Sequence, residues 1–211
     1  MKTTILLEKL WLEKKEFVTA KELKEYCKLF KMKYDSVIHY LLKMKYMTRI
    51  FRGIFYIKSL EEAKMKKSKY NHLELVAKGL ELKGVKNWYF GLHTALKLNN
   101  MTHEYFVIDE VVSDSLFRSK PVSIAGYKFR FVKISPSLFD FGMNKYNDLP
   151  YSDPEKTILD FAYLSKQDGM TTDRTIMDVS EWAKDLSKDK LKKYAKKYPK
   201  SISHMAEIII K

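Results

Sequence analysis

Apolar residues near the start of the chain recur at helical spacing. Residues 3–15 carry one wide apolar stripe, formed by Ile5, Leu6, Leu7, Leu10, Trp11 and Leu12. A second helix is predicted to begin at Thr19, because Thr19 is a good N-cap and Glu22 completes a capping box three residues later. It turns Leu23, Tyr26 and Cys27 inward and stops near Phe30. Residues 33–46 predict a third helix, with buried positions at Val37, Ile38, Leu41, Leu42 and Met44.

A hairpin follows the third helix. Residues 47–51 and 54–58 are rich in strand-forming side chains, and the pair Arg52-Gly53 between them suits a tight turn in which Gly53 takes a positive φ. The order helix, short extended piece, helix, helix, hairpin is that of a winged helix-turn-helix. In this arrangement the second helix of the pair can enter the major groove of DNA. We therefore expect a winged helix-turn-helix DNA-binding domain over residues 1–60.

The third helix has a polar face opposite its apolar one. The residues expected there can donate hydrogen bonds to base edges or stack on sugars; they are Ser36, His39, Tyr40 and Lys43. Lys33 and Tyr34 lie at the helix N-terminus, where backbone N–H groups favour a phosphate. The hairpin adds Arg49 and Arg52, the two arginines of the first 69 residues, as contacts to the minor groove or to phosphates. The alternative is a protein-interaction module, because a solvated helix face has much the same composition.

Charge is unevenly distributed along the chain. Residues 1–69 hold 18 Lys/Arg and 8 Asp/Glu, a net charge of +10, whereas residues 70–183 hold 13 and 15, a net charge of −2. Residues 184–200 carry a net charge of +6, with 8 basic and 2 acidic side chains. A basic first third followed by a near-neutral body indicates a polyanion-binding module joined to a second domain. Part of the excess also reflects a general enrichment in lysine.

Composition and charge change after a short connecting segment. Residues 61–69 are mostly charged and predict a linker or connecting helix, and residues 70–211 predict a mixed α/β domain with a helical C-terminus. Within it we expect a helix over 73–82, a strand at 88–90 turning at Gly91 into a helix, a strand at 105–109, and a hairpin of 122–125 with 128–134. The fold class is therefore α+β.

The search for chemistry identifies no catalytic constellation. The sequence contains neither a P-loop nor a GxGxxG nor a GxSxG motif, and its five histidines are scattered. Asp153, Glu155 and Lys156 superficially resemble a metal-nuclease triad. However, Ser152-Asp153-Pro154-Glu155 also predicts a capping box with proline in the first turn of a helix, so capping and the helix dipole account for the carboxylates. We expect no enzyme activity, no metal and no cofactor.

The lysine-rich segment 184–200 is a candidate polyanion surface. Five of its lysines are candidate contacts to a polyanion: Lys190, Lys192, Lys193, Lys196 and Lys197. Such a segment is usually a solvated helix face, but beside a DNA-binding domain it can add phosphate contacts. No apolar run approaches the roughly 18 residues that a membrane span needs. With one cysteine and no recognisable signal peptide, we expect a cytoplasmic protein with no membrane partner.

Three segments resemble AbiEi-type antitoxins, the regulators of type IV toxin–antitoxin systems. They are Val18–Leu23, Trp88–Leu96 and Ser152–Asp160, the last with Lys156 where such proteins usually carry arginine. The resemblance spans nearly the whole chain in order and spacing. It implies an N-terminal domain that binds operator repeats in double-stranded DNA and represses its own operon. It also implies a second domain that counters a nucleotidyltransferase-like toxin without necessarily touching it. The alternatives are a stand-alone winged-helix regulator and an interaction scaffold without a toxin partner.

Overall fold

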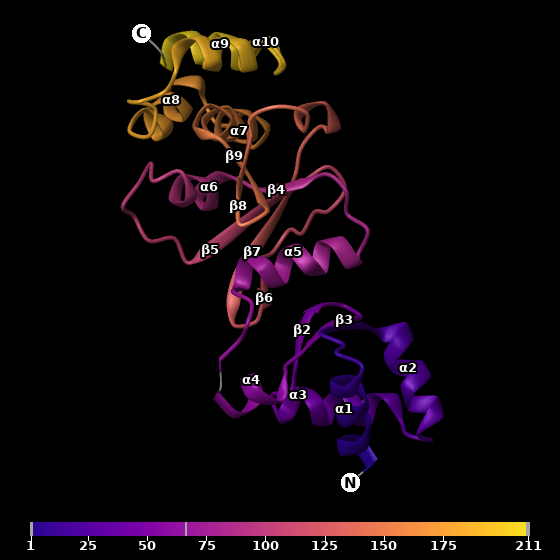
Figure 1. Ribbon diagram of the computed structural model, residues 1–211. Coiled ribbons are helices and arrows are strands. Elements are labelled where there is room, and N and C mark those ends of the chain that lie inside the picture. The colour runs from indigo at the N-terminus through magenta and orange to yellow at the C-terminus, as the bar shows by residue number, and fades with distance from the viewer. Residues whose placement is uncertain (1, 66, 210–211) are drawn as a thin grey trace. The chain divides into compact units, whose positions relative to one another are not determined.

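A computed structural model describes residues 2–65 and 67–209. The chain is a mixed α/β protein whose C-terminal part, from residue 154 on, is helical, as expected from the sequence (Figure 1). It divides into two compact units. The first comprises Met1–Gly84 together with Ser123–Gly126, and the second comprises Val85–Val122 together with Tyr127–Lys211.

The first unit begins with the predicted order of three helices and a hairpin. Its elements are α1 (Lys2–Leu12), β1 (Phe17–Thr19), α2 (Ala20–Leu29), α3 (Tyr34–Lys43), β2 (Met47–Phe51) and β3 (Ile54–Ile57). The strands form an antiparallel sheet in the order β1-β3-β2. Gly53 turns the hairpin with φ +78°, as its position in the sequence predicted. The helices and strands expected over residues 3–58 are therefore confirmed, with shorter helix ends.

The start of α2 shows why these residues fold as they do. The Thr19 hydroxyl accepts the Glu22 N–H at 3.2 Å, and the Glu22 carboxylate accepts the Thr19 N–H at 2.8 Å, so the predicted capping box is present. Side chains from all three helices and from the strands meet in one apolar core, which includes Leu6, Leu7, Leu10, Leu23, Val37, Leu41 and Phe55. Three expected core positions differ, because Ile5, Leu12 and Met44 are exposed. Helix α3 ends before both Met44 and Lys45, and Lys45 adopts φ +59°.

The boundary of the first unit lies further along the chain than the sequence suggested. The expected linker contains α4 (Leu60–Met65), and α5 (His72–Leu82), expected in the second domain, packs against β2 and β3. Gly79 permits this close approach, since a Cβ there would meet Ile50 at 2.5 Å and Phe51 at 2.8 Å. The boundary between the units therefore falls after Gly84 rather than after residue 69.

The second unit carries a six-stranded mixed sheet in the order β6-β7-β5-β4-β9-β8, of which the β6 residues Ser123 and Ile124 are grouped with the first unit. The strands are β4 (Trp88–Phe90), β5 (Ile108–Ser113), β6 (Val122–Ile124), β7 (Tyr127–Lys133), β8 (Met143–Tyr146) and β9 (Leu149–Ser152). Two of the pairings, β5 with β7 and β4 with β9, are parallel. The predicted strand 88–90 and the predicted 122–134 hairpin are confirmed.

Two features of this sheet differ from expectation. The strand expected at 105–109 begins instead at Ile108 and runs to Ser113, since it pairs with β4 on one side and β7 on the other. Tyr105 lies outside the sheet and is 85% exposed. The β8–β9 hairpin was not predicted, because β8 is largely exposed and has no apolar alternation of the kind that marks a half-buried strand.

Helices of the C-terminal part gather on one side of this sheet (Figure 1). The remaining elements are α6 (Leu92–Leu98), η1 (Pro136–Leu138), α7 (Pro154–Gln167), α8 (Thr172–Ser180), α9 (Lys188–Ala195) and α10 (Lys200–Ile209). One apolar core joins sheet to helices, with Tyr89 and Val112 from the strands, Leu159 from α7, Leu191 from α9 and Met205 from α10. This core fixes α9, the lysine-rich helix, against α7.

Candidate nucleic-acid interface and buried ionic networks

The polar face of α3 is exposed. Val37, Ile38 and Leu41 are buried, and the predicted DNA-contacting residues lie on the opposite side of the helix: Ser36, His39, Tyr40 and Lys43. Tyr40 is 37% exposed. No ion pair within residues 2–65 and 67–209 engages Lys43. The face can therefore offer donors, acceptors and a ring to an incoming surface.

Both hairpin arginines are exposed, but they are held differently. The guanidinium of Arg49 lies over the ring of Phe55 at 5.7 Å, which fixes its direction by a cation–π contact. The β2–β3 register shifts between Arg49 and Phe51, a bulge of the kind that redirects neighbouring side chains. Arg52 sits at the turn beside Gly53. Neither arginine forms an ion pair with a described residue, so both are available to an anion.

The N-terminus of α3 differs in detail from the expectation. Lys33 is the N-cap residue and is exposed, but its side chain makes no capping hydrogen bond. Tyr34 is only half-buried, and the Lys24 ammonium lies 5.3 Å from the centre of its ring. Burial raises the pKa of Tyr34, so its hydroxyl stays protonated and able to donate. These three residues place two ammonium groups and one hydroxyl near the first turn of α3.

In the second unit, Asp153 and Glu155 have different roles. Asp153 caps α7 by accepting the Lys156 N–H at 2.9 Å, so it is the N-cap; Ser152 is not, and the predicted capping box is wrong. Glu155 accepts the N–H of Ser187, the N-cap of α9, at 3.0 Å. It therefore stabilises the start of another helix. The predicted capping box of Ser152 with Glu155 does not form, because Glu155 instead accepts the backbone N–H of Ser187 at the start of α9.

Lys190 joins these two carboxylates. Its Nζ lies 2.8 Å from Oδ2 of Asp153 and 3.0 Å from Oε2 of Glu155, and both carboxylates are nearly buried. Partial burial lowers the pKa of Lys190, but the interactions with Asp153 and Glu155 outweigh that effect and raise the pKa. Tyr194 donates to Asp153 at 3.1 Å. Two carboxylates that resembled metal ligands in the sequence are thus engaged by a lysine, a tyrosine and a backbone N–H, and Oε2 of Glu155 meets Lys190 as an ion pair without a hydrogen bond.

A second ionic network is fully enclosed. Nζ of Lys156 lies 3.2 Å from Oδ1 of Asp160, and neither side chain is exposed to solvent. The hydroxyls of Tyr89 and Tyr198 both donate to Asp160 at 2.7 Å. Nζ also lies 4.7 Å from the centre of the Phe141 ring. Burial lowers the pKa of Lys156, although the nearby Asp160 opposes that shift.

Another buried carboxylate, Glu110 on β5, organises the first turn of α6. One oxygen accepts the His93 N–H at 2.8 Å and lies 2.9 Å from Nδ1 of His93, and the other accepts a hydrogen bond from Arg130. Gly91, the N-cap of α6, has no side chain to satisfy these donors. Glu110 therefore replaces the missing cap from a neighbouring strand.

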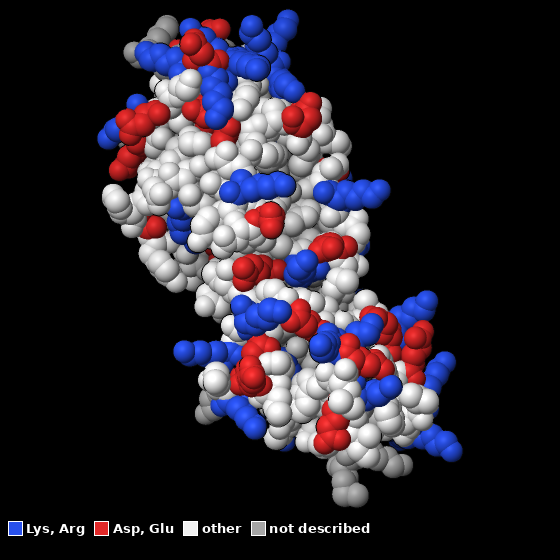
Figure 2. Space-filling view, viewed as in Figure 1, with Lys and Arg blue, Asp and Glu red and all other residues white. Residues whose placement is uncertain are grey.

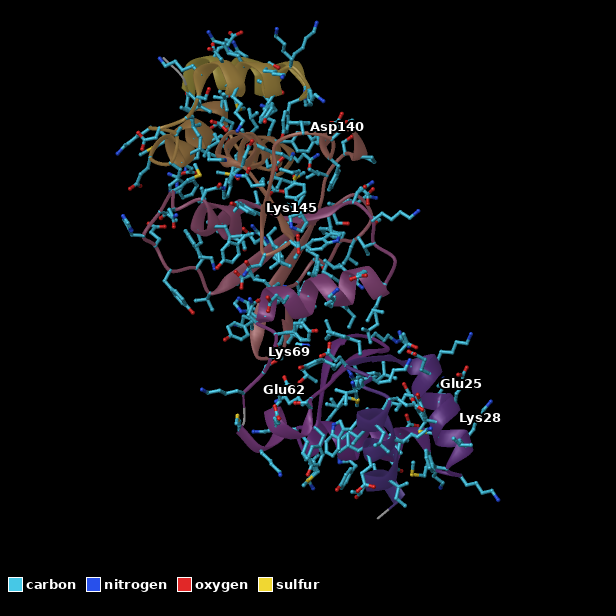
Figure 3. The ribbon with its side chains drawn as sticks, viewed as in Figure 1. Glu25, Lys28, Glu62, Lys69, Asp140 and Lys145 are labelled. Atoms are coloured by element: carbon cyan, nitrogen blue, oxygen red, sulfur yellow. The ribbon has the colours of Figure 1, made fainter. Side chains whose placement is uncertain are left out.

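The predicted lysine surface is only partly free. Lys190 is engaged as described above, and Nζ of Lys197 lies 3.0 Å from Oδ2 of Asp140, which Figure 3 labels near the start of β8. Lys192, Lys193 and Lys196 are exposed and form no ion pair within the described part of the chain. Lys and Arg side chains crowd the end of the molecule that carries α9 and α10 (Figure 2). The candidate polyanion surface therefore shrinks to these three residues.

The enclosed network of Lys156 and Asp160 was not predicted from the sequence. Lys156 and Asp160 stand one helical turn apart, and both positions fall among apolar residues of α7 that turn inward. A lysine and an aspartate four residues apart are ordinarily a surface pair. The signal that could have revealed them was their place on the apolar face of the helix.

Among the described residues, no helix is long and apolar enough to cross a membrane. Within the same residues, no group of three or more His, Cys, Asp or Glu side chains is arranged to hold a metal ion.

Comparison with known proteins gives the fold alone. No family model matches the chain. No curated protein matches it either. Among solved structures, the chain is similar to the crystal structure of the RV2827C protein from Mycobacterium tuberculosis, with a TM-score of 0.61 and 12% sequence identity. That match covers 99% of this chain and 76% of the other, so the folds of both units recur in the solved protein.

Proposed function

We propose that this protein is a DNA-binding transcriptional regulator whose first unit is a winged helix-turn-helix. One observation carries the proposal: the exposed polar face of α3 and the two arginines of the adjoining hairpin are left without ion-pair partners among the described residues. Exposed cations beside a helix that can enter the major groove favour binding to DNA phosphates. The net charge of +10 over residues 1–69 supports the same partner.

The resemblance to AbiEi-type antitoxins supports a more specific role. In this role the protein represses its own operon from operator repeats and counters a nucleotidyltransferase-like toxin in the cytoplasm. Asp153, Glu155 and Lys156, the residues most like a catalytic cluster, are engaged in capping and ion pairs, which favours a non-catalytic second unit. The alternatives remain a stand-alone regulator and a protein-interaction scaffold.

Three free lysines at α9 are a second candidate DNA surface, carried by the second unit. Lys192, Lys193 and Lys196 are exposed, whereas Leu191 and Ala195 are buried in the core. We assign them phosphate contacts on DNA that flanks the operator. Each phosphate neutralised contributes about −0.9 to the slope of log K against log salt concentration. Replacing all three by glutamine should therefore make the slope shallower by about 1 to 3.

The test uses the full chain and a labelled duplex from its own upstream region. Fluorescence anisotropy at several salt concentrations should give a steep slope, which becomes shallower in Arg49→Gln and Arg52→Gln. Lys64→Gln is the control, because Lys64 is an exposed lysine on α4, a helix that carries none of the proposed contact residues. Salt-insensitive binding, or equal losses in Lys64→Gln and the arginine variants, contradicts the proposed interface.

The antitoxin role needs a separate test. Any nucleotidyltransferase-like toxin encoded beside this protein should be co-expressed with the wild-type chain and with Arg49→Gln/Arg52→Gln. Protection from the toxin should persist in the double variant if the second unit supplies it, while repression of the operon is lost. Loss of protection in a folded double variant would assign protection to DNA binding instead.

A further inference from the structure

A basic hollow lies at the base of the hairpin in the first unit. Three cations line it, Lys45 after α3, Arg49 on β2 and Lys58 after β3, together with Thr48 and Ser68. Among the residues that the structure describes, no carboxylate lines it. None of the three cations forms an ion pair with a described residue, so their charge is not neutralised within that part of the chain. Lysine, arginine and hydroxyl donors without competing carboxylates are the groups that hold a phosphate.

General lysine enrichment does not explain this charge. A second hollow in the same unit, beside α1 and α4, is lined by three lysines and three glutamates: Lys14, Lys15, Lys69, Glu16, Glu61 and Glu62. Its charges balance, and its residues include the Lys69–Glu16 pair at 2.5 Å; Figure 3 labels Lys69. The two hollows therefore differ by three units of charge within one small domain. That contrast favours an anionic occupant for the basic hollow alone.

The basic hollow also has room and apolar surface for the rest of an organic molecule. Its volume is about 530 Å³, within the roughly 300–1,000 Å³ typical of small-molecule sites. Leu42 and Met47, from α3 and β2, and Leu75, from α5, contribute its apolar lining. Cationic and hydroxyl-bearing residues beside an aliphatic lining suit a ligand that carries a phosphate on an organic body.

We propose that the basic hollow is an effector site for a small phosphate monoester with a ring, of the nucleoside monophosphate class. Arg49 connects this site to the DNA surface, since it lines the hollow and is also one of the two exposed arginines of the hairpin. A bound phosphate draws the Arg49 guanidinium away from DNA and adds a negative charge next to it. Effector binding therefore weakens DNA binding. This second step rests on the proposed function, whereas ligand binding itself does not.

The binding test uses adenosine 5′-monophosphate as the probe and adenosine as its neutral match, titrated calorimetrically into the full chain. We expect saturable binding of the monophosphate below about 1 mM, with adenosine at least about tenfold weaker. Lys58→Gln and Lys45→Gln should each weaken the monophosphate about fivefold. Lys15→Gln, in the neutral hollow, should leave it unchanged. Equal binding of the two probes, no saturable binding of the monophosphate, or equal losses in all three variants overturns the site.

The regulatory step is tested separately by anisotropy with the operator duplex. Millimolar adenosine 5′-monophosphate should weaken DNA binding by wild type severalfold more than adenosine does, and should have much less effect on Lys58→Gln. If the probe binds but DNA affinity is unchanged, the effector role is wrong and the site stands. If the chain binds no DNA at all, the proposed function fails while calorimetry still reports on the site.

Discussion

Nζ of Lys190 lies 2.8 Å from Oδ2 of Asp153, so a lysine of the basic helix α9 is directed inward to the start of α7. The same ammonium reaches Glu155, whose other oxygen accepts a backbone N–H at the start of α9. One cation and two carboxylates thus connect the N-termini of two helices. The two carboxylates are buried while Lys190 is 41% exposed, so the carboxylates depend on the lysine more than the lysine depends on them.

Replacing Lys190 by alanine should cost more than the loss of a cap, because it leaves the buried carboxylates of Asp153 and Glu155 without their cation. Removing the partner of a buried charge costs about 3–5 kcal/mol, whereas removing a cap alone costs about 1 kcal/mol. The double variant with alanine at both carboxylates should lose less than Lys190→Ala, because the Lys190 ammonium that remains is 41% exposed and water can solvate it. Chemical denaturation measures both losses. A larger loss in the double variant than in Lys190→Ala would show that Lys190 contributes little.

The buried Lys156–Asp160 pair predicts that a second substitution restores stability lost by the first. Lys156→Met leaves Asp160 buried without its cation and should destabilise the chain by about 3–5 kcal/mol. Adding Asp160→Asn removes the orphaned charge while keeping an oxygen for the Tyr89 and Tyr198 hydroxyls. The double variant should recover a large part of the loss in denaturant titrations. If the double variant is less stable than Lys156→Met, the buried charge is not the source of the cost.

The lowered pKa of Lys156 sets the sign of its pH dependence. Between that lowered value and the ordinary lysine value of about 10.4, the unfolded chain binds the proton more fully than the folded one. Stability from this group therefore rises with pH in that window. The difference in unfolding free energy between wild type and Lys156→Met should grow as pH approaches 10. A difference that shrinks over this range would contradict the lowered pKa.

Gly79→Ala tests the position of α5. Helix propensity favours alanine over glycine by about 1 kcal/mol, so an unconstrained site would be stabilised. Here the added Cβ would meet Ile50 at 2.5 Å, and we expect a net loss of about 1–3 kcal/mol. Ala77→Gly, elsewhere on α5, is the control and should show the propensity effect alone. Stabilisation by Gly79→Ala would place α5 away from β2.

The sequence predicted local structure where the decisive contacts are close along the chain. Thr19 and Glu22 form their capping box, and Gly53 turns the hairpin, because each needs only neighbouring residues. The sequence did not predict contacts that depend on a residue distant along the chain. Glu155 is recruited by α9, Glu110 replaces the cap that Gly91 lacks, and Lys156 is enclosed by rings from three segments. Residue pattern alone does not identify these partners.

The exposed face of α3 could also be predicted from the sequence, because it depends on residues that are close along the chain. Apolar positions of α3 identify its buried side, and the opposite side then follows from helix geometry. By contrast, the basic hollow depends on Lys45, Arg49 and Lys58, which come from three segments and meet only in the folded unit. Likewise, Lys190 and Lys197 counted as free cations in the sequence, and only the fold revealed their carboxylates.

The last prediction distinguishes residues that contact base edges from residues that contact the DNA backbone. Ser36 and His39 lie on the exposed face of α3, where side chains can reach base edges, so Ser36→Ala and His39→Ala should relax sequence preference. Removing one hydrogen bond to a base edge should cost about 1–3 kcal/mol of binding free energy on the preferred duplex and little on a scrambled one. Arg52→Gln should weaken both duplexes about equally and make the salt slope shallower by about 1, as expected for a phosphate contact. Competition titrations with both duplexes separate the two classes. If Arg52→Gln discriminates between the duplexes while His39→Ala does not, the hairpin reads the sequence and α3 holds the backbone.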